Sequence, residues 1–145
     1  MKIHQLSIFL QNEPGQVIKV CRTLRQEGID IRTLMLADSA QYGILRLIVS
    51  DWEAGARALG DAGFVVNDTE VIAAEVPDEP GGLAALLELI DGTDTNIEYM
   101  YTCTLGRGDR AVLLFRFDDP DRAIERLRVS AVTVLNAAEV YLCPS

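Results

Sequence analysis

The chain has 145 residues, of which 49% are hydrophobic and 24% are charged, a composition typical of a folded globular protein rather than a disordered one. Thirteen Lys and Arg residues against 22 Asp and Glu give a formal net charge of −9, which argues against nucleic acids and anionic membrane surfaces as partners. We expect a cytoplasmic protein, because the sequence shows no membrane-length apolar run, no cleavable leader, and only three widely spaced cysteines: Cys21, Cys103 and Cys143.

The first elements predicted along the chain are a strand and a helix. Leu6, Ile8 and Leu10 alternate with other side chains at the period of a strand, and Pro14 fits the first turn of a helix that ends at Gly28. Apolar residues then recur at positions i, i+3, i+4 and i+7, which gives this helix one apolar face: Val17, Val20, Cys21 and Leu24.

Three further strands and a second helix complete the first half of the chain. Two strands are predicted over residues 29–36 and 43–49, with turn residues 38–41 between them. A second helix begins near Asp51, a good N-cap residue, and a short last strand covers residues 64–66. The order β-α-β-β-α-β predicts an α+β fold of the ferredoxin-like kind, a four-stranded antiparallel sheet with both helices on one face.

The second half repeats the first at an offset of 66 residues (12 to 78). Asn12-Glu13-Pro14-Gly15 aligns with Asp78-Glu79-Pro80-Gly81, and the apolar strand and helix positions align around it. A two-residue insertion near residues 106–108 changes the offset to 68, so that Asp51 aligns with Asp119. We therefore predict two ferredoxin-like repeats, residues 1–68 and 69–145, that meet at the short polar stretch 67–69.

The predicted strands are apolar on both faces. Runs such as residues 44–45, 47–49 and 112–115 lack the polar alternation of a strand with one solvent-exposed face. A single repeat of about 70 residues is also marginally stable alone. Both observations favour further burial of the sheets, and we expect the chain to form a homodimer.

The duplicated turn resembles that of the ACT domain family. The resemblance rests on Asn/Asp-x-Pro-Gly between the first strand and the first helix of each repeat, together with Gly28-Ile29-Asp30-Ile31 and Thr95-Asn96-Ile97 where the second strand begins. It covers nearly the whole chain, once per repeat. ACT domains are small-molecule sensing modules, most often for amino acids, and the resemblance implies a ligand bound at an interface between paired units.

The residue types in these turns suit an amino acid. A helix that opens at Pro-Gly has unpaired N–H groups that attract a carboxylate, and glycine allows a ligand or a backbone to approach closely. The resemblance implies ligand binding by two groups of residues, one at each Pro-Gly turn and one at each second strand: Asn12, Glu13, Pro14, Gly15, Gln16, Val17, Asp30, Ile31, Asp78, Gly81, Gly82, Leu83, Asn96 and Ile97.

The repeats carry different side chains at the key positions. If the units pair across a pseudo-two-fold axis, Asn12 faces Asn96 and Asp78 faces Asp30. The amide pair fits an amino acid better, because two carboxylates would repel the ligand's own carboxylate. The alternative interpretation is that these residues only turn the chain and bond the local backbone.

Other residues offer little catalytic chemistry. His4 is the only histidine and is predicted to be an exposed strand residue, while Cys21 is predicted to lie in the core. No Cys-x-x-Cys pair, base–nucleophile pair or cofactor motif is present, so we expect no metal, no cofactor and no catalytic residues. The sequence predicts a non-catalytic amino-acid-binding regulatory protein. The alternatives are a regulatory subunit of an amino-acid biosynthetic enzyme, acting through protein contacts, and a small ferredoxin-like enzyme.

Overall fold

A computed structural model of the chain describes residues 2–38, 42–103, 108–130 and 132–141. Most of the predicted turn at 38–41, most of the insertion at 106–108, and Cys143 lie outside these residues. The chain divides into two compact units. We call residues 4–69 the first unit, and residues 1–3 together with 70–145 the second unit.

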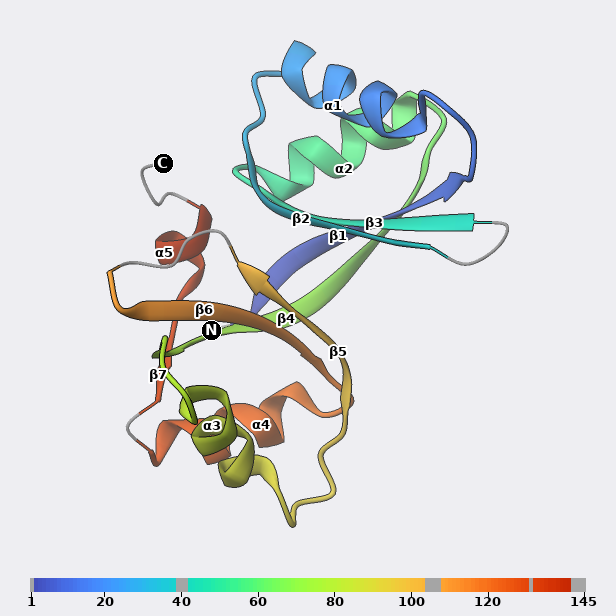
Figure 1. Ribbon diagram of the computed structural model, residues 1–145. Helices are drawn as coiled ribbons and strands as arrows, with labels where there is room; N and C mark the ends of the chain where they lie inside the picture. The colour runs from blue at the N-terminus through green and yellow to red at the C-terminus, as the bar shows by residue number, and fades with distance from the viewer. Residues whose placement is uncertain (1, 39–41, 104–107, 131, 142–145) are drawn as a thin grey trace. The chain divides into compact units, whose positions relative to one another are not determined.

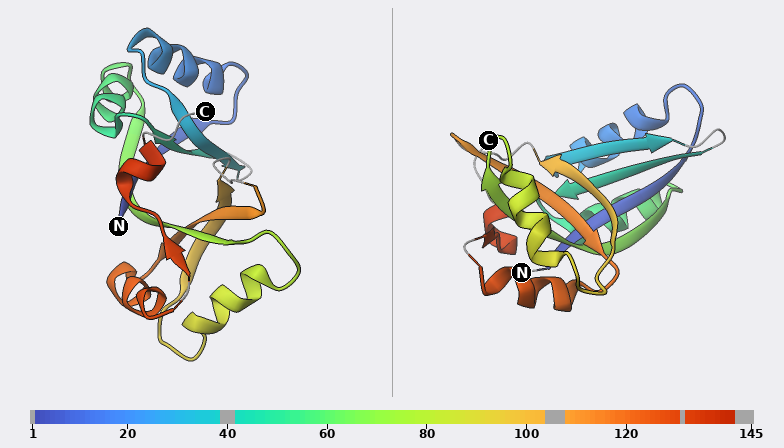
Figure 2. Two further views of the ribbon diagram at one scale, coloured as in Figure 1. Left: turned by 90° about the vertical axis from the view of Figure 1, so that its left-hand side faces the viewer. Right: turned by 60° about the horizontal axis from the view of Figure 1, so that its bottom comes forward.

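The first unit has the predicted order of strands and helices (Figure 1). Its elements are β1 (Ile3–Gln11), α1 (Gln16–Gln26), β2 (Ile31–Asp38), β3 (Tyr42–Val49), α2 (Trp52–Asp61) and the start of β4 (Val65–Pro77). The strands lie in the order β2-β3-β1-β4, and β3 is antiparallel to both of the strands beside it. Helices α1 and α2 pack against each other on one face of the sheet, as the turned views of Figure 2 show.

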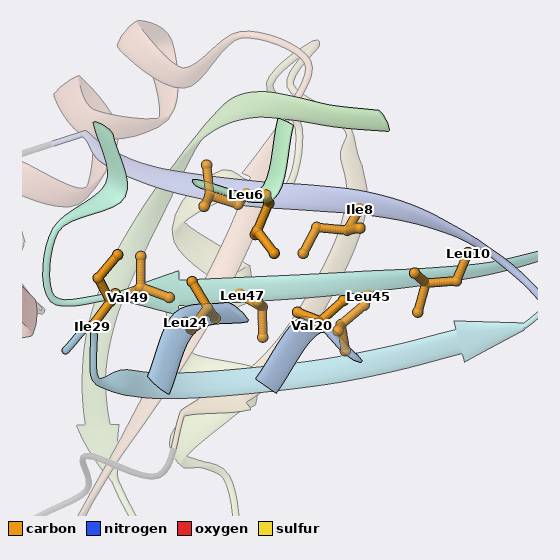
Figure 3. Close-up of a cluster of buried hydrophobic side chains, with 10 residues drawn as sticks. Leu6, Ile8, Leu10, Val20, Leu24, Ile29, Leu45, Leu47 and Val49 are labelled. Atoms are coloured by element: carbon orange, nitrogen blue, oxygen red, sulfur yellow. The ribbon is translucent and has the colours of Figure 1, made fainter. Parts of the chain in front are cut away.

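The core of the first unit lies between this sheet face and the two helices (Figure 3). It is built by alternate residues of β1 and β3 and by the apolar side of the helices, as the two periodicities require. Its buried members are Leu6, Ile8, Leu10, Val20, Leu24, Ile29, Leu45, Leu47, Val49 and Leu59. Cys21, predicted to lie in the core, is only half-buried, because it lies at the edge of the apolar side of α1.

The second unit repeats this arrangement. It contains the end of β4, then α3 (Gly82–Ile90), β5 (Ile97–Cys103), β6 (Arg110–Phe117), α4 (Pro120–Arg128), β7 (Thr133–Val134) and α5 (Ala137–Tyr141). Its strand order is β5-β6-β4-β7, equivalent to that of the first unit, and α3 packs against α4. The short helix α5 was not predicted from the sequence.

Equivalent hydrogen bonds recur in both units. The backbone N–H of Asp30 donates to Ser50 Oγ at 3.0 Å, and that of Asn96 donates to Asp118 Oδ1 at 2.8 Å. The predicted N-cap Asp51 accepts from its helix backbone at 3.1 Å, and Asp119 does the same in the second unit at 3.1 Å. The predicted fold class, tandem α+β units with antiparallel sheets, is confirmed.

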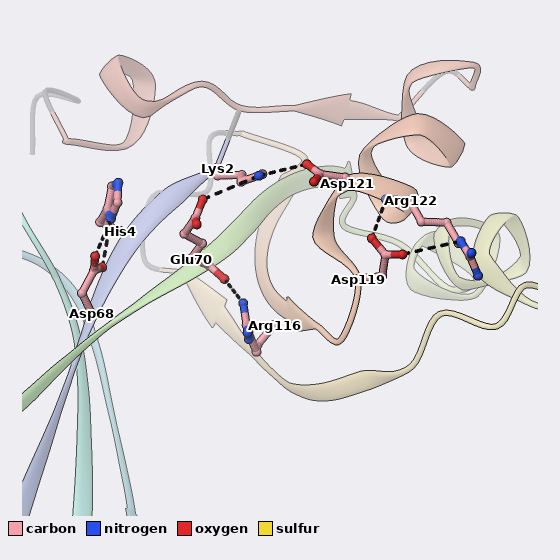
Figure 4. Close-up of polar contacts among 8 residues, drawn as sticks. All are labelled: Lys2, His4, Asp68, Glu70, Arg116, Asp119, Asp121 and Arg122. Atoms are coloured by element: carbon pink, nitrogen blue, oxygen red, sulfur yellow. Dashed lines mark hydrogen bonds and ion pairs between the residues drawn. The ribbon is translucent and has the colours of Figure 1, made fainter.

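The strand β4 belongs to both units. It continues through residues 67–69, the polar stretch between the repeats, and the division between the units falls within it, after Thr69. Near this point Lys2 Nζ lies 2.9 Å from Asp121 Oδ1 and 3.8 Å from a carboxylate oxygen of Glu70 (Figure 4). The Arg116 side chain donates to the Glu70 carbonyl oxygen at 2.9 Å. These contacts all lie within the second unit.

Candidate functional site

The Pro-Gly turn of the first unit leaves the start of α1 without a cap. Gly15 is the N-cap residue and has φ +86°, a left-handed conformation that favours glycine. The helix begins at Gln16, so Pro14 lies in the turn before it rather than in its first turn as predicted. In this described segment no side chain caps α1, and its first turn holds no acidic residue.

The start of α3 has the same character, whereas α2 and α4 differ. Gly81 has φ +86° and no side-chain hydrogen bond caps α3, which is also fully described. In contrast, Asp51 and Asp119 cap α2 and α4, and each of those helices has an acid in its first turn, Glu53 or Asp121. The positive ends of α1 and α3 are therefore not neutralised by the helices' own first turns.

A cavity of about 400 Å³ adjoins the start of α1. Four of the predicted ligand residues, Asn12, Glu13, Gln16 and Val17, line it. Four further residues that the sequence analysis missed complete the lining: Leu10, Gln11, Leu36 and Gly43. We call this cavity the α1 pocket. Its volume lies within the range of about 300–1,000 Å³ that is usual for small-molecule sites.

Strand pairing brings the missed residues to the α1 pocket. Leu10 pairs with Gly43, and Leu36 pairs with Leu45 two residues further along β3. Directly opposed residues share a face of the sheet, so Leu36 lies on the same face as the core residues of β3. Cross-strand register would have been the signal, but the sequence does not show which residues of β2 and β3 are opposed.

The other predicted residues of the first unit lie away from this pocket. Asp30 and Ile31 follow the far end of α1, a helix of 11 residues and therefore about 16 Å long. Arg32 Nη1 donates to Asp30 Oδ2 at 2.6 Å, and Ile31 packs against the core. The structure thus brings together the turn residues of the prediction, but not the residues that open the second strand.

The Pro-Gly turn of the second unit is closed by its own backbone. Gly82 is buried, and a Cβ added to it would lie 2.1 Å from the carbonyl oxygen of Pro77. The backbone N–H of Asp78 donates to the Asp109 carbonyl at 2.7 Å. In the first unit the position equivalent to Gly82 is Gln16, whose side chain lines the α1 pocket. At the start of α3 the Pro77 backbone therefore occupies space that the Gln16 side chain occupies at the start of α1.

The remaining predicted residues of the second unit fall at both ends of α3. Leu83 is 37% exposed near its start, whereas Asn96 and Ile97 follow its far end. Those two residues help to line a separate cavity of about 500 Å³. Asn96 and Ile97 are therefore not brought together with the turn residues of their own unit.

His4 is half-buried rather than exposed, because it contacts two other elements of the first unit. Its Nδ1 lies 2.9 Å from both carboxylate oxygens of Asp68, and its ring stacks on Trp52 with centroids 4.1 Å apart. Among the described residues, no group of three or more His, Cys, Asp or Glu side chains is placed to hold a metal ion. This histidine thus joins β1 to β4 and α2.

Comparison with known proteins identifies the family. A sequence model described as an ACT domain pair matches residues 1–140. The chain belongs to this family of paired ACT domains. The two units of the structure are accordingly ACT units, as the resemblance of the Pro-Gly turns implied.

Solved structures agree with this assignment. Protein BT0572 from Bacteroides thetaiotaomicron is 38% identical and has a TM-score of 0.91, with 97% of this chain and 96% of that chain covered. The regulatory subunits of aspartate kinase from Thermus thermophilus and Thermus flavus are 14% and 16% identical, with TM-scores of 0.61 and 0.62. The two alignments cover 87% and 88% of this chain, and 91% and 90% of the respective kinase subunits. At this identity the likeness to the kinase subunits concerns the fold alone.

A comparison with curated proteins gave no significant match. The longest helix of the described chain, α1, has 11 residues, and no described helix combines the length and hydropathy that a membrane span requires.

Proposed function

We propose that this ACT domain pair is a non-catalytic regulatory protein that binds a free amino acid in the α1 pocket. The observation that carries the proposal is the uncapped start of α1, with Gly15 in the left-handed conformation, beside a cavity of about 400 Å³. The ligand's α-carboxylate accepts hydrogen bonds from the first N–H groups of this helix, whose dipole favours a negative charge there.

The ligand's ammonium group is held by oxygen atoms of the same turn and of the end of β1. Asn12 and Gln11 offer amide oxygens, and Glu13 offers a carboxylate, all three in the lining of the pocket. Both charges of a free amino acid are thereby matched at one end of the cavity. A peptide-bonded residue lacks both charges, so the pocket selects the free amino acid.

A second ACT unit completes the site in this proposal. It supplies the residue that opens its own second strand, which is Asn96 when the second repeat is the partner. A ligand that bridges two units favours the arrangement in which it contacts both, and this preference is what couples binding to regulation.

The proposal also includes a homodimer. Leu34 and Leu36 are 52% and 51% exposed on β2, a strand at the edge of its sheet, and Phe9 is 42% exposed on β1. Edge strands with large exposed apolar side chains promote association. Analytical ultracentrifugation at the concentrations used for ligand titration measures the assembly state. A monomer at those concentrations would contradict the proposed dimer.

A thermal-shift screen against the twenty amino acids tests ligand binding. An amino acid present at 100 times its dissociation constant stabilises the folded chain by about 2.7 kcal/mol, which gives a clear rise in Tm. Asn12→Ala removes an amide from the turn and is expected to abolish the shift. Asn67→Ala removes an exposed amide that lies outside the pocket and is expected to retain it. Absence of any shift with folded wild-type protein would refute the proposed function.

A further inference from the structure

We infer that the α1 pocket selects amino acids with uncharged, apolar side chains, and that Leu36 and Val17 determine this specificity. The inference rests on the proposed amino-acid binding and names the class of ligand. It follows from the way in which polar and apolar residues are distributed over the lining of the cavity.

The lining has a polar part and an apolar part. The polar residues come from the end of β1, the turn and the start of α1: Gln11, Asn12, Glu13 and Gln16. The apolar residues come from three elements, Leu10 from β1, Val17 from α1 and Leu36 from β2. When the charged groups of an amino acid contact the polar residues, the surface that this unit leaves for its side chain is the apolar part.

Leu36 and Val17 are partly exposed to solvent, and a ligand in the pocket would cover them. Leu36 is 51% exposed and Val17 38% exposed, whereas Leu10, the third of these apolar lining residues, is 3% exposed. Burial of apolar surface contributes about 25 cal/mol per Å², so covering these two side chains favours a ligand of the same character. A hydroxyl or amide placed there would lose its hydrogen bonds with water and gain none from these side chains.

Charge excludes the remaining amino acids. Among the described residues with which the first unit lines the pocket, Glu13 carries the only charge, so an acidic side chain finds no cation on this unit and meets a carboxylate. A lysine or arginine side chain would compete with the ligand's own ammonium for Glu13. Its long cationic end would otherwise lie against Leu36 and Val17, where nothing compensates for lost hydration.

The experiment is a calorimetric titration of the wild-type chain with leucine, methionine and phenylalanine, and with aspartate, lysine and serine. We expect the apolar ligands to bind at least tenfold more tightly than the others, since differences in apolar contact typically change affinity by about 10–200-fold. If aspartate, lysine or serine binds best, the inference is wrong while the proposed function stands. If no amino acid binds, the proposed function itself fails.

Two leucines of β2 provide a matched pair of variants. Leu36→Ala is expected to weaken binding of the best apolar ligand about tenfold. Leu34→Ala removes the same atoms at equal exposure, two residues away and outside the pocket lining, and is expected to leave the affinity unchanged. Because both leucines also lie in the proposed dimer contact, sedimentation is used to choose a protein concentration at which the two variants have the same assembly state. Equal losses in the two variants at that concentration would contradict the role of Leu36.

Discussion

Val17 shows how a side chain can follow the spacing of a core residue and still lie outside the core. It belongs to the apolar positions of α1 with Val20 and Leu24, which are buried, yet Val17 is 38% exposed. Val17 lies in the first turn of α1 and lines the α1 pocket instead. Periodicity predicts which side of a helix is apolar. It does not predict how much of that side other elements cover.

Lys2 offers a test of the polar contacts near the N-terminus. The hydrogen bond and the charge of Asp121, followed by the charge of Glu70, raise the pKa of Lys2 above its ordinary value of 10.5. We expect Asp121→Asn to lower this pKa and Glu70→Gln to lower it less, because Lys2 Nζ lies 2.9 Å from Asp121 and 3.8 Å from Glu70. NMR titration of the Lys2 side chain measures both shifts, with Lys19, the other lysine, as reference signal.

The sign of the linked stability follows from the direction of this shift. A lysine whose pKa is raised on folding adds stability that is fully present below pH 10.5, and this stability is lost as the pH rises through the folded value. At neutral pH the folded chain therefore retains the whole stabilising contribution of the Lys2 contacts. A larger pKa decrease in Glu70→Gln than in Asp121→Asn would contradict the assigned order of the two partners.

Gly82 is the residue on which the start of α3 depends. Because a Cβ there would lie 2.1 Å from the Pro77 carbonyl oxygen, Gly82→Ala must displace backbone, and we expect a loss of about 1–3 kcal/mol in the free energy of unfolding. Gly60→Ala is the control. Gly60 lies in α2 with no atom within 4 Å of an added Cβ, so alanine there is expected to stabilise by about 0.5–1 kcal/mol.

Denaturant unfolding of both glycine variants measures these changes. A Gly82→Ala variant as stable as wild type would show that β4 and α3 separate without cost, and would remove the reason for regarding this turn as closed.

The order of the elements was predictable because it depends on local patterns. Alternation in β1, helical spacing in α1 and the N-cap residues Asp51 and Asp119 each act over a few residues. The α1 pocket was predictable only in part. Asn12 and Gln16 belong to the recognisable turn, whereas Leu36 reaches it through the pairing of β2 with β3, which depends on register.

The sequence predicted the difference between the two turns only in part. Glycine at position 82, where the first repeat has Gln16, allows a close approach, but the sequence does not say whether a ligand or the chain itself makes it. In the structure it is the Pro77 carbonyl oxygen. Likewise His4 gave no sign of its contacts, because Asp68 and Trp52 are distant in sequence.

At the scale of the whole molecule, the difference between the two turns predicts the binding stoichiometry. We expect one amino acid per chain in a calorimetric titration, because a cavity adjoins the start of α1, whereas at the start of α3 the Pro77 carbonyl oxygen lies where a side chain at position 82 would begin. Asn12→Ala is expected to abolish binding, and Asp78→Ala, the equivalent change in the second repeat, to leave it intact. Two equivalents per chain, or loss of binding in Asp78→Ala, would contradict this expectation.

The grouping of residues 1–3 with residues 70–145 makes the first unit an insertion within the second. A gene deletion that removed the first repeat from its start would also remove Ile3, which is fully buried, and Lys2, the ion-pair partner of Glu70 and Asp121. The surviving repeat would then lack a core side chain and leave two carboxylates without their lysine. Because β4 also spans the division between the units, we expect a chain cut back to one repeat to be less stable than the pair, so that a single deletion does not readily undo the repetition.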